Sequence, residues 1–290
     1  MNNGLWKSRV GKIFAALSVG TLLATAACGS ASASSDDQED TVVKVALTTA
    51  TDEPIWDQVN KNLEEANAHV KVETVAMKSA VLGNQALAAG DVDLSAQQHY
   101  AFLKGEIKSK GYKLSVIADT YLSPLSLYSN KIKNVSGLKK GDKILIPNDE
   151  TNGGRALGVL ESAGVIKLDA SKNDPGEGVY PHVEDITDNP LDIDLVPTDR
   201  NLIMSSLDDA AAGIANANAV VDYGRSTDDA IFKVDLDPKL DYNKPWINVI
   251  VARTKDKDNA AYKKIVKAYH TESVKKAIDK ALKGSVVPVW

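Results

Sequence analysis

A segment near the middle of the chain combines a buried strand, two glycines and an arginine. Residues 144–157 read ILIPNDETNGGRAL, which predicts a strand, a glycine-containing turn and a helix with Arg155 on its first turn. The N–H groups at a helix N-terminus favour an anion, and Gly153 lets a ligand approach the backbone closely. An arginine can bind a carboxylate through two parallel hydrogen bonds. The segment predicts a carboxylate or phosphate site; the alternative is a plain strand–turn–helix with a surface arginine.

The chain has one cysteine, Cys28, at the end of an apolar N-terminal stretch. Three basic residues precede position 13, and residues 13–27 carry no charge. This stretch is shorter than the roughly 20 apolar residues of a spanning helix and is typical of a secretory signal. Small residues directly before Cys28 suit a lipoprotein signal peptidase. We therefore predict a signal peptide over 1–27 and a lipid on Cys28; the alternative is an ordinary cleaved signal with an incidental cysteine.

Composition narrows the class of protein. The formal net charge is −5 and no basic stripe is visible, so nucleic acid is not an expected partner. A single cysteine excludes a disulfide framework and a Cys-rich metal site, and no cofactor is expected. Residues 28–41, rich in Ser, Ala and Asp, predict a flexible tether. The protein is thus expected on the extracytoplasmic face of the cell membrane, held through its lipid anchor only.

After the tether, short apolar β-branched runs alternate with helical patterns, which predicts an α/β fold with largely parallel sheets. The expected strands are residues 42–47, 70–76, 91–95, 114–118, 125–129, 143–147, 218–222 and 247–252. The expected helices are residues 54–68, 81–89, 97–110, 155–163, 258–269 and 271–282.

These elements fall into two groups that predict two lobes. Residues 42–121 and 235–290 would form lobe 1, and residues 122–234 would form lobe 2. Ligands of open α/β sheets bind at the carboxyl ends of the strands, so the cleft between the lobes is the expected site.

The run from Pro147 to Arg155 resembles the signature of methionine-binding lipoproteins, the solute-binding subunits of methionine ABC importers. Agreement extends over essentially the whole mature domain in one order. Other agreeing segments are Gln98-His99, residues 111–114, 127–129, 183–190, 206–209 and 245–253.

The resemblance implies a periplasmic-binding-protein fold whose two α/β lobes close over one amino acid. It assigns the ligand carboxylate to Arg155 and further polar contacts to Asn216, in an Asn-x-Asn turn, and Asn248, in the last strand. The chemistry fits, because amide oxygens accept hydrogen bonds from an ammonium group. Without the family, both asparagines would be read as turn or cap residues.

The side-chain pocket departs from the family pattern. Gln97 and Ala219 stand where aromatic residues are common, and Tyr121 stands at a common histidine position. Phe102 matches an aromatic position. A thioether gains only about 0.3 to 1.5 kcal/mol from each aromatic neighbour, so these losses do not forbid methionine. A polar group left unpaired on burial costs about 1 to 3 kcal/mol, which favours a more polar side chain.

His99 is expected to be a hydrogen-bonding helix residue near the cleft, the alternatives being a metal ligand or a catalytic base. Trp56 and Trp246 are expected in the core or at a lobe edge. The predicted ligand-binding set is Arg155, Asn216, Asn248, Gln97, His99, Phe102, Tyr121 and Gly153.

The predicted function is extracytoplasmic capture of an amino acid, with L-methionine first, and its delivery to an ABC transporter permease by a monomeric lipoprotein. Alternatives are another amino acid, a methionine-containing dipeptide, or a surface adhesion lipoprotein that has lost solute binding. An enzyme is not expected, because the chain lacks G-x-S-x-G, H-E-x-x-H and Walker motifs and any cysteine after Cys28.

Overall fold

The computed structural model describes residues 40–290. The predicted signal peptide, Cys28 and nearly all of the predicted tether lie outside the described residues. Thr41, expected to end the tether, is already the first residue of strand β1, so the folded part begins slightly earlier than predicted. None of the described helices combines the length and apolar character needed to cross a membrane.

The larger sheet is mixed and has six strands in the order β12-β4-β11-β3-β1-β2. β1 pairs in parallel with β2 and β3, whereas β11 runs antiparallel to β3 and β4. The late strand β11 therefore inserts between two early ones. The strands are β1 (Thr41–Leu47), β2 (Val70–Ala76), β3 (Leu94–His99), β4 (Leu114–Leu122), β11 (Ile247–Arg253) and β12 (Val287–Pro288).

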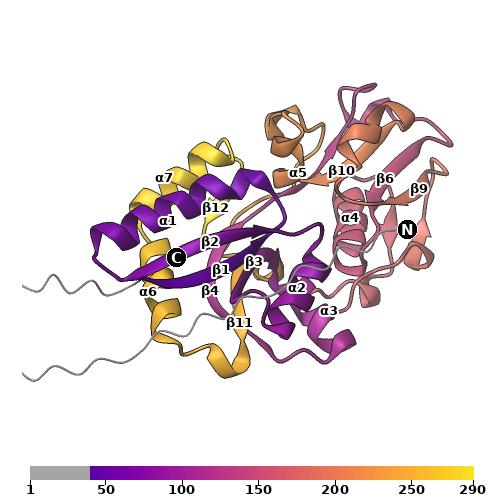
Figure 1. Ribbon diagram of the computed structural model, residues 1–290. Coiled ribbons are helices and arrows are strands. Elements are labelled where there is room, and N and C mark those ends of the chain that lie inside the picture. Colours follow the sequence, from indigo (N-terminus) through magenta and orange to yellow (C-terminus); the bar gives the residue numbers. More distant parts are fainter. Residues whose placement is uncertain (1–39) are drawn as a thin grey trace, which may run out of the picture. The chain divides into compact units, whose positions relative to one another are not determined.

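Helices cover both faces of this sheet (Figure 1). Successive strand residues point to opposite faces, so Val45 of β1 packs in one core cluster and Ala46 in another. The first cluster includes side chains of α1 (Glu53–Glu65), α6 (Ala260–Tyr269) and α7 (Glu272–Ala281). The second includes side chains of α2 (Ala80–Ala89) and α3 (Tyr100–Lys110).

The smaller sheet has four strands in the order β5-β10-β6-β9, and α4 (Glu150–Ser162) packs its apolar side against the core of this sheet. β6 is parallel to β10 and β9, and β5 is antiparallel to β10. A two-stranded sheet of β7 (Lys167–Leu168) and β8 (Ile186–Asp188) stands beside α4. The four strands are β5 (Leu125–Tyr128), β6 (Lys143–Pro147), β9 (Asp194–Thr198) and β10 (Ala212–Asn216).

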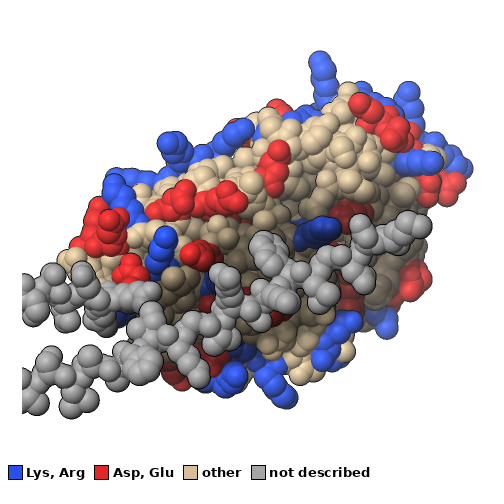
Figure 2. Space-filling view, in the orientation of Figure 1, with Lys and Arg blue, Asp and Glu red and all other residues tan. Residues whose placement is uncertain are grey.

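The fold of residues 40–290 is the predicted two-lobed α/β arrangement within one compact unit. The large sheet takes its strands from residues 41–122 and 247–288, and the small sheet from residues 125–216. Only Ser123 and Pro124 separate β4 of one sheet from β5 of the other. On the face in Figure 2, acidic and basic side chains are interspersed.

Four predicted elements differ from the structure in type or in where they begin. Residues 218–222 are not a strand but lie in helix α5 (Ala217–Asp222), and the strand is β10, directly before it. The β-branched pair Val220-Val221 suggested a strand, but local packing overrides that weak preference. The third strand begins at Leu94 rather than Asp91 and takes in Gln97 to His99, so α3 begins only at Tyr100. The helix predicted to open at Arg155 begins five residues earlier.

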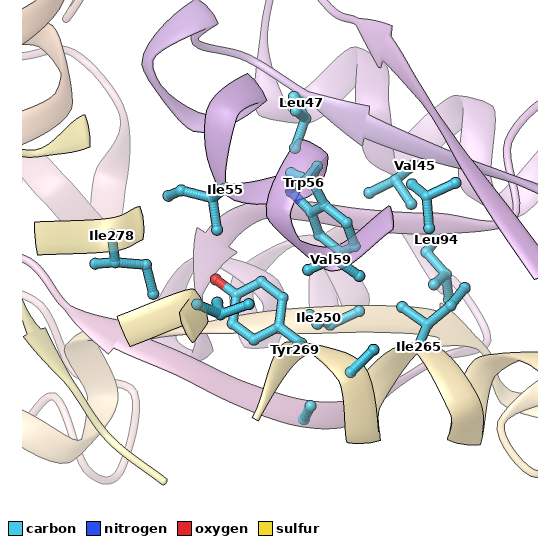
Figure 3. Packing of buried hydrophobic residues seen from close by; sticks show 14 of the residues in the cluster. Val45, Leu47, Ile55, Trp56, Val59, Leu94, Ile250, Ile265, Tyr269 and Ile278 are labelled. Carbon is cyan, nitrogen blue, oxygen red and sulfur yellow. The ribbon is translucent and has the colours of Figure 1, made fainter. Parts of the chain in front are cut away.

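Trp56 anchors the larger core. It is 2% exposed, and its ring centroid lies 5.4 Å from that of Tyr269 on α6 (Figure 3). Replacing Trp56 by alanine removes this contact and leaves a cavity, so we expect a loss of about 3 to 5 kcal/mol in the free energy of unfolding, measured by urea denaturation. Leu82→Ala, at a 45% exposed position on α2, is the control and should change it little. Equal losses in both variants would contradict this assignment of the core.

Candidate functional site

A cavity between the two sheets gathers most of the predicted ligand-binding residues. Its empty volume is about 640 Å³, including open solvent at its mouth. Of the eight residues predicted from sequence, all except Gly153 line it. The lining residues are Thr48, Thr49, Asp52, Ala80, Gln97, Gln98, His99, Phe102, Tyr121, Ser123, Asn152, Arg155, Arg200, Asn201, Asn216, Asn218, Ala219 and Asn248.

Arg155 is buried on the cavity wall without a carboxylate partner. Its Nη2 donates to the carbonyl oxygen of Ser123 at 2.8 Å, and its Cζ lies 4.8 Å from the ring centroid of Trp246. Burial lowers the pKa of Arg155 to about 9. Across residues 40–290, no Asp or Glu forms an ion pair with it. Because a buried charge is costly unless paired, the guanidinium favours an anionic ligand group.

The local structure around Arg155 differs from the sequence prediction. α4 begins at Glu150, and the Asp149 carboxylate caps it by accepting from the backbone N–H of Asn152 at 2.9 Å. The Asp149 carboxylate thus already occupies a backbone N–H group at this helix N-terminus, so the predicted carboxylate site depends on Arg155 and stays a prediction. Arg155 lies in the second turn of α4. Trp246, expected in the core or at a lobe edge, supports the Arg155 guanidinium with its ring face.

Both glycines lie inside α4, at positions where neighbouring atoms leave no room for a side chain. A Cβ on Gly153 would come within 2.9 Å of the Pro147 carbonyl oxygen. One on Gly154 would come within 2.8 Å of the Tyr180 Cβ. Because a side chain at either position would clash, glycine is favoured there despite its cost of roughly 1 kcal/mol in a helix. The glycines let α4 pack tightly against its neighbours, and the structure places Gly153 outside the cavity.

His99 ends β3 and caps α3, rather than lying inside a helix as predicted. Its Nδ1 accepts from the backbone N–H of Phe102 at 3.1 Å. The proton therefore sits on Nε2, which donates to Oδ1 of Asn152 at 3.3 Å. Burial, with the positive charge of Arg155, lowers the pKa of His99 to about 3, so the ring is neutral. The described residues contain no cluster of His, Cys, Asp and Glu side chains able to hold a metal.

The two predicted asparagines lie at the cavity with different bonding. Nδ2 of Asn216 donates to Oδ1 of Asn152 at 3.4 Å, and its own Oδ1 is buried with no donor among the described residues. Nδ2 of Asn248 donates to the Tyr121 carbonyl oxygen at 3.3 Å. A hydrogen-bond donor of the ligand would satisfy the Asn216 oxygen.

Gln97 and Phe102 line the same cavity near its α2 and α3 wall. Nε2 of Gln97 donates to the Ala80 carbonyl oxygen at 3.3 Å, and Oε1 is buried without a donor in the described part of the chain. A Cβ on Gly83 would overlap this amide, so only glycine there leaves room for it. The Phe102 ring meets His99 edge to face, with centroids 6.4 Å apart.

Asp52 is the main residue that the sequence reasoning missed. Its carboxylate is 6% exposed and accepts from the hydroxyls of Thr49 at 2.8 Å and Tyr121 at 3.0 Å. Nδ2 of Asn218 adds contacts at 3.3 and 3.4 Å. Burial raises the pKa of Asp52 to about 6. A sequence position could have pointed to these residues. Asp52 closely follows β1 and Arg200 closely follows β9, and each strand has parallel neighbours in its own sheet. Ligands of such sheets bind at the carboxyl ends of the strands.

Comparison with known proteins decides the family. Residues 43–290 match the NlpA lipoprotein family. The chain belongs to the NlpA lipoprotein family. It is 35% identical over 285 residues to the D-methionine-binding lipoprotein MetQ of Salmonella typhimurium, covering 96% of this chain and 98% of the relative.

Solved structures of similar proteins agree with this membership. A nutrient-binding protein from Burkholderia cenocepacia bound to methionine has a TM-score of 0.80 and 34% identity, over 86% of this chain and 100% of that one. The substrate-binding protein of a methionine transporter from Streptococcus pneumoniae has a TM-score of 0.78 and 33% identity, over 86% and 96%. The predicted family resemblance and two-lobed fold are therefore confirmed.

The raised pKa of Asp52 predicts a stability penalty at neutral pH. Below pH 3.8 both folded and unfolded chains hold the proton; between 3.8 and about 6 the unfolded chain loses it first. The free energy of unfolding therefore falls as the pH rises through this window. At pH 7.5 Asp52→Asn should be more stable than wild type by about 1 to 3 kcal/mol, because the cost of ionising a buried carboxyl group disappears while one hydrogen bond is lost.

Urea denaturation at pH 7.5 and pH 4 measures this difference. The advantage of Asp52→Asn should shrink at pH 4, where Asp52 is protonated in the folded state. Asp57→Asn, at an exposed position on α1, is the control and should follow wild type at both pH values. A destabilised Asp52→Asn at pH 7.5 would show that the carboxylate supports the fold.

Proposed function

We propose that this chain is an extracytoplasmic solute-binding lipoprotein that captures an amino acid and delivers it to an ABC importer. The observation that carries the proposal is the buried, unpaired Arg155 guanidinium on the wall of an interlobe cavity. A relative named for D-methionine and a similar structure bound to methionine support methionine as the first ligand to test, with the predicted L-form measured beside the D-form. Arg155 binds the ligand carboxylate, and Asn216 and Asn248 accept from its ammonium group.

Capture couples ligand binding to closure of the lobes. Hydrogen bonds already join the two halves across the cavity, from His99 to Asn152 and from Arg200 to Thr48. A ligand shifts the population toward the closed form only through contacts that it makes there. Arg155, attached to α4 and seated on Trp246, supplies such a contact. The similarity to methionine-binding proteins supports binding and delivery rather than turnover of the ligand.

Thermal unfolding with added amino acids tests this function. A ligand at about 100 times its dissociation constant adds roughly 2.7 kcal/mol to stability, which raises the melting temperature measurably. Arg155→Ala should abolish that rise, because the ligand carboxylate loses its only guanidinium on α4. Arg225→Ala, which breaks an ion pair with Asp229 outside the cavity, should retain it. If no amino acid raises the melting temperature and Arg155→Ala changes nothing, the proposal fails.

The anchor is tested separately in cells. We expect lipidation of Cys28 to place the protein at the membrane, with residues 28–40 as a tether. The lobe boundaries stay proposed at residues 122 and 235. The expected result for Cys28→Ala is loss of acyl labelling and a shift from the membrane fraction to the soluble fraction. Unchanged membrane association would point to another means of attachment.

A further inference from the structure

The hydroxyl group of Ser123 is a polar group of the cavity wall that has no partner in the fold. Ser123 lines the cavity and is 4% exposed. Its Oγ is buried and forms no hydrogen bond within the described part of the chain. Buried polar groups in native proteins nearly always have a partner, so this hydroxyl needs an explanation. Its position in the cavity wall indicates a partner that enters the cavity.

The backbone of Ser123 holds this hydroxyl close to Arg155. Ser123 and Pro124 form the short link between β4 and β5. The Ser123 carbonyl oxygen accepts from Nη2 of Arg155 at 2.8 Å. Because the carbonyl and the hydroxyl belong to one residue and both side chains line the cavity, the hydroxyl and the guanidinium border the same part of it.

The charge of Arg155 decides which ligand group suits the hydroxyl. A serine hydroxyl can either donate a hydrogen bond or accept one. A ligand ammonium group at this place would bring a second cation next to a buried guanidinium, whereas a carboxylate would pair with it. A carboxylate offers about four acceptor positions on its two oxygens, which is enough for both donors. The hydroxyl is therefore best satisfied by donating to a carboxylate that Arg155 also binds.

Ser95 shows that a buried hydroxyl without a partner does not by itself make a ligand contact. It lies on β3, is 0% exposed, and its Oγ also forms no hydrogen bond among residues 40–290. Unlike Ser123, it does not line the cavity. The argument for Ser123 thus depends on the combination of its unpaired hydroxyl, its place in the cavity wall and its contact with Arg155. Ser95 is the matched control for it.

Resting on the proposed function, we propose that the Ser123 hydroxyl donates to the carboxylate of the bound amino acid and shares that carboxylate with Arg155. Ser123 is then a ligand-binding residue in addition to those predicted from the sequence. Its carbonyl orients the guanidinium, and its hydroxyl completes the carboxylate site. The contact raises the affinity for the group that all amino acids share and does not select a side chain.

Isothermal titration calorimetry with L-methionine, and with D-methionine beside it, tests this contact. Ser123→Ala should weaken the tighter-binding form by about tenfold, equivalent to about 1.4 kcal/mol, because the carboxylate loses one charge-assisted hydrogen bond. Ser95→Ala should bind within about twofold of wild type, since the substituted residue does not line the cavity. Unchanged affinity in Ser123→Ala would overturn the proposal.

Urea denaturation without ligand separates binding from a structural role. Ser123→Ala removes a hydroxyl that forms no hydrogen bond in the described part of the chain, so its unfolding midpoint should equal or exceed that of wild type. Ser95→Ala should behave in the same way. A lower midpoint for Ser123→Ala would show that the hydroxyl supports the fold, and its effect on binding would then be indirect, against the proposal.

A crystal structure of the protein with bound methionine identifies the ligand group. Oγ of Ser123 should lie within about 3 Å of a carboxylate oxygen of the ligand, and Arg155 should contact the same carboxylate. An Oγ that bonds to the ligand ammonium group, or to no ligand atom, would contradict the proposal.

The two proposals fail in different ways. If Arg155→Ala abolishes binding and Ser123→Ala leaves it unchanged, the proposed function stands and only the Ser123 contact is excluded. If neither form of methionine nor any other standard amino acid binds to wild type, the proposed function fails and the Ser123 contact fails with it.

Discussion

The site depends on one constraint, the burial of the Arg155 guanidinium without a carboxylate partner among residues 40–290. Three separate parts of the molecule hold it. α4 carries it, the Ser123 carbonyl at the link between the two sheets accepts from it, and Trp246, directly before β11, supports its face. Because a desolvated cation is costly, these parts fit together best when an anion enters the cavity. The same group therefore connects ligand binding to the relative position of the lobes.

Asp52 opposes Arg155 in charge and is equally well fixed. Its carboxylate is held by hydroxyls and an amide, and it remains costly to the unliganded fold at neutral pH. A residue that lowers stability while lining a ligand cavity is typical of a functional site, where strain or buried charge is retained for binding. The neutral His99 ring fits the same logic, since a protonated ring beside Arg155 would add a second buried cation.

Family membership and ligand preference rest on different parts of the molecule. The family match extends over residues 43–290, nearly the whole described part of the chain. Within the cavity wall, the Gln97 amide lies against Gly83, and Ala219 lines the same cavity. The fold and the family do not by themselves fix the ligand, because ligand preference depends on the side chains that line the cavity.

The local sequence pattern by itself determined the fold class and several residues of the site. Alternating apolar runs predicted the α/β class, and Arg155, Asn216 and Asn248 were placed at the interlobe cleft by a motif resemblance. The sequence could not predict that Asp149 caps α4 and moves its start to Glu150, or that His99 ends a strand, since side-chain capping competes with periodicity over only a few residues. Asp52, Tyr121 and Asn218 lie far apart in the chain, and only the folding of β1, β4 and α5 around one cavity brings them into hydrogen-bonding contact. Burial, which the tertiary structure alone decides, turns an ordinary aspartate into an acid with a strongly raised pKa.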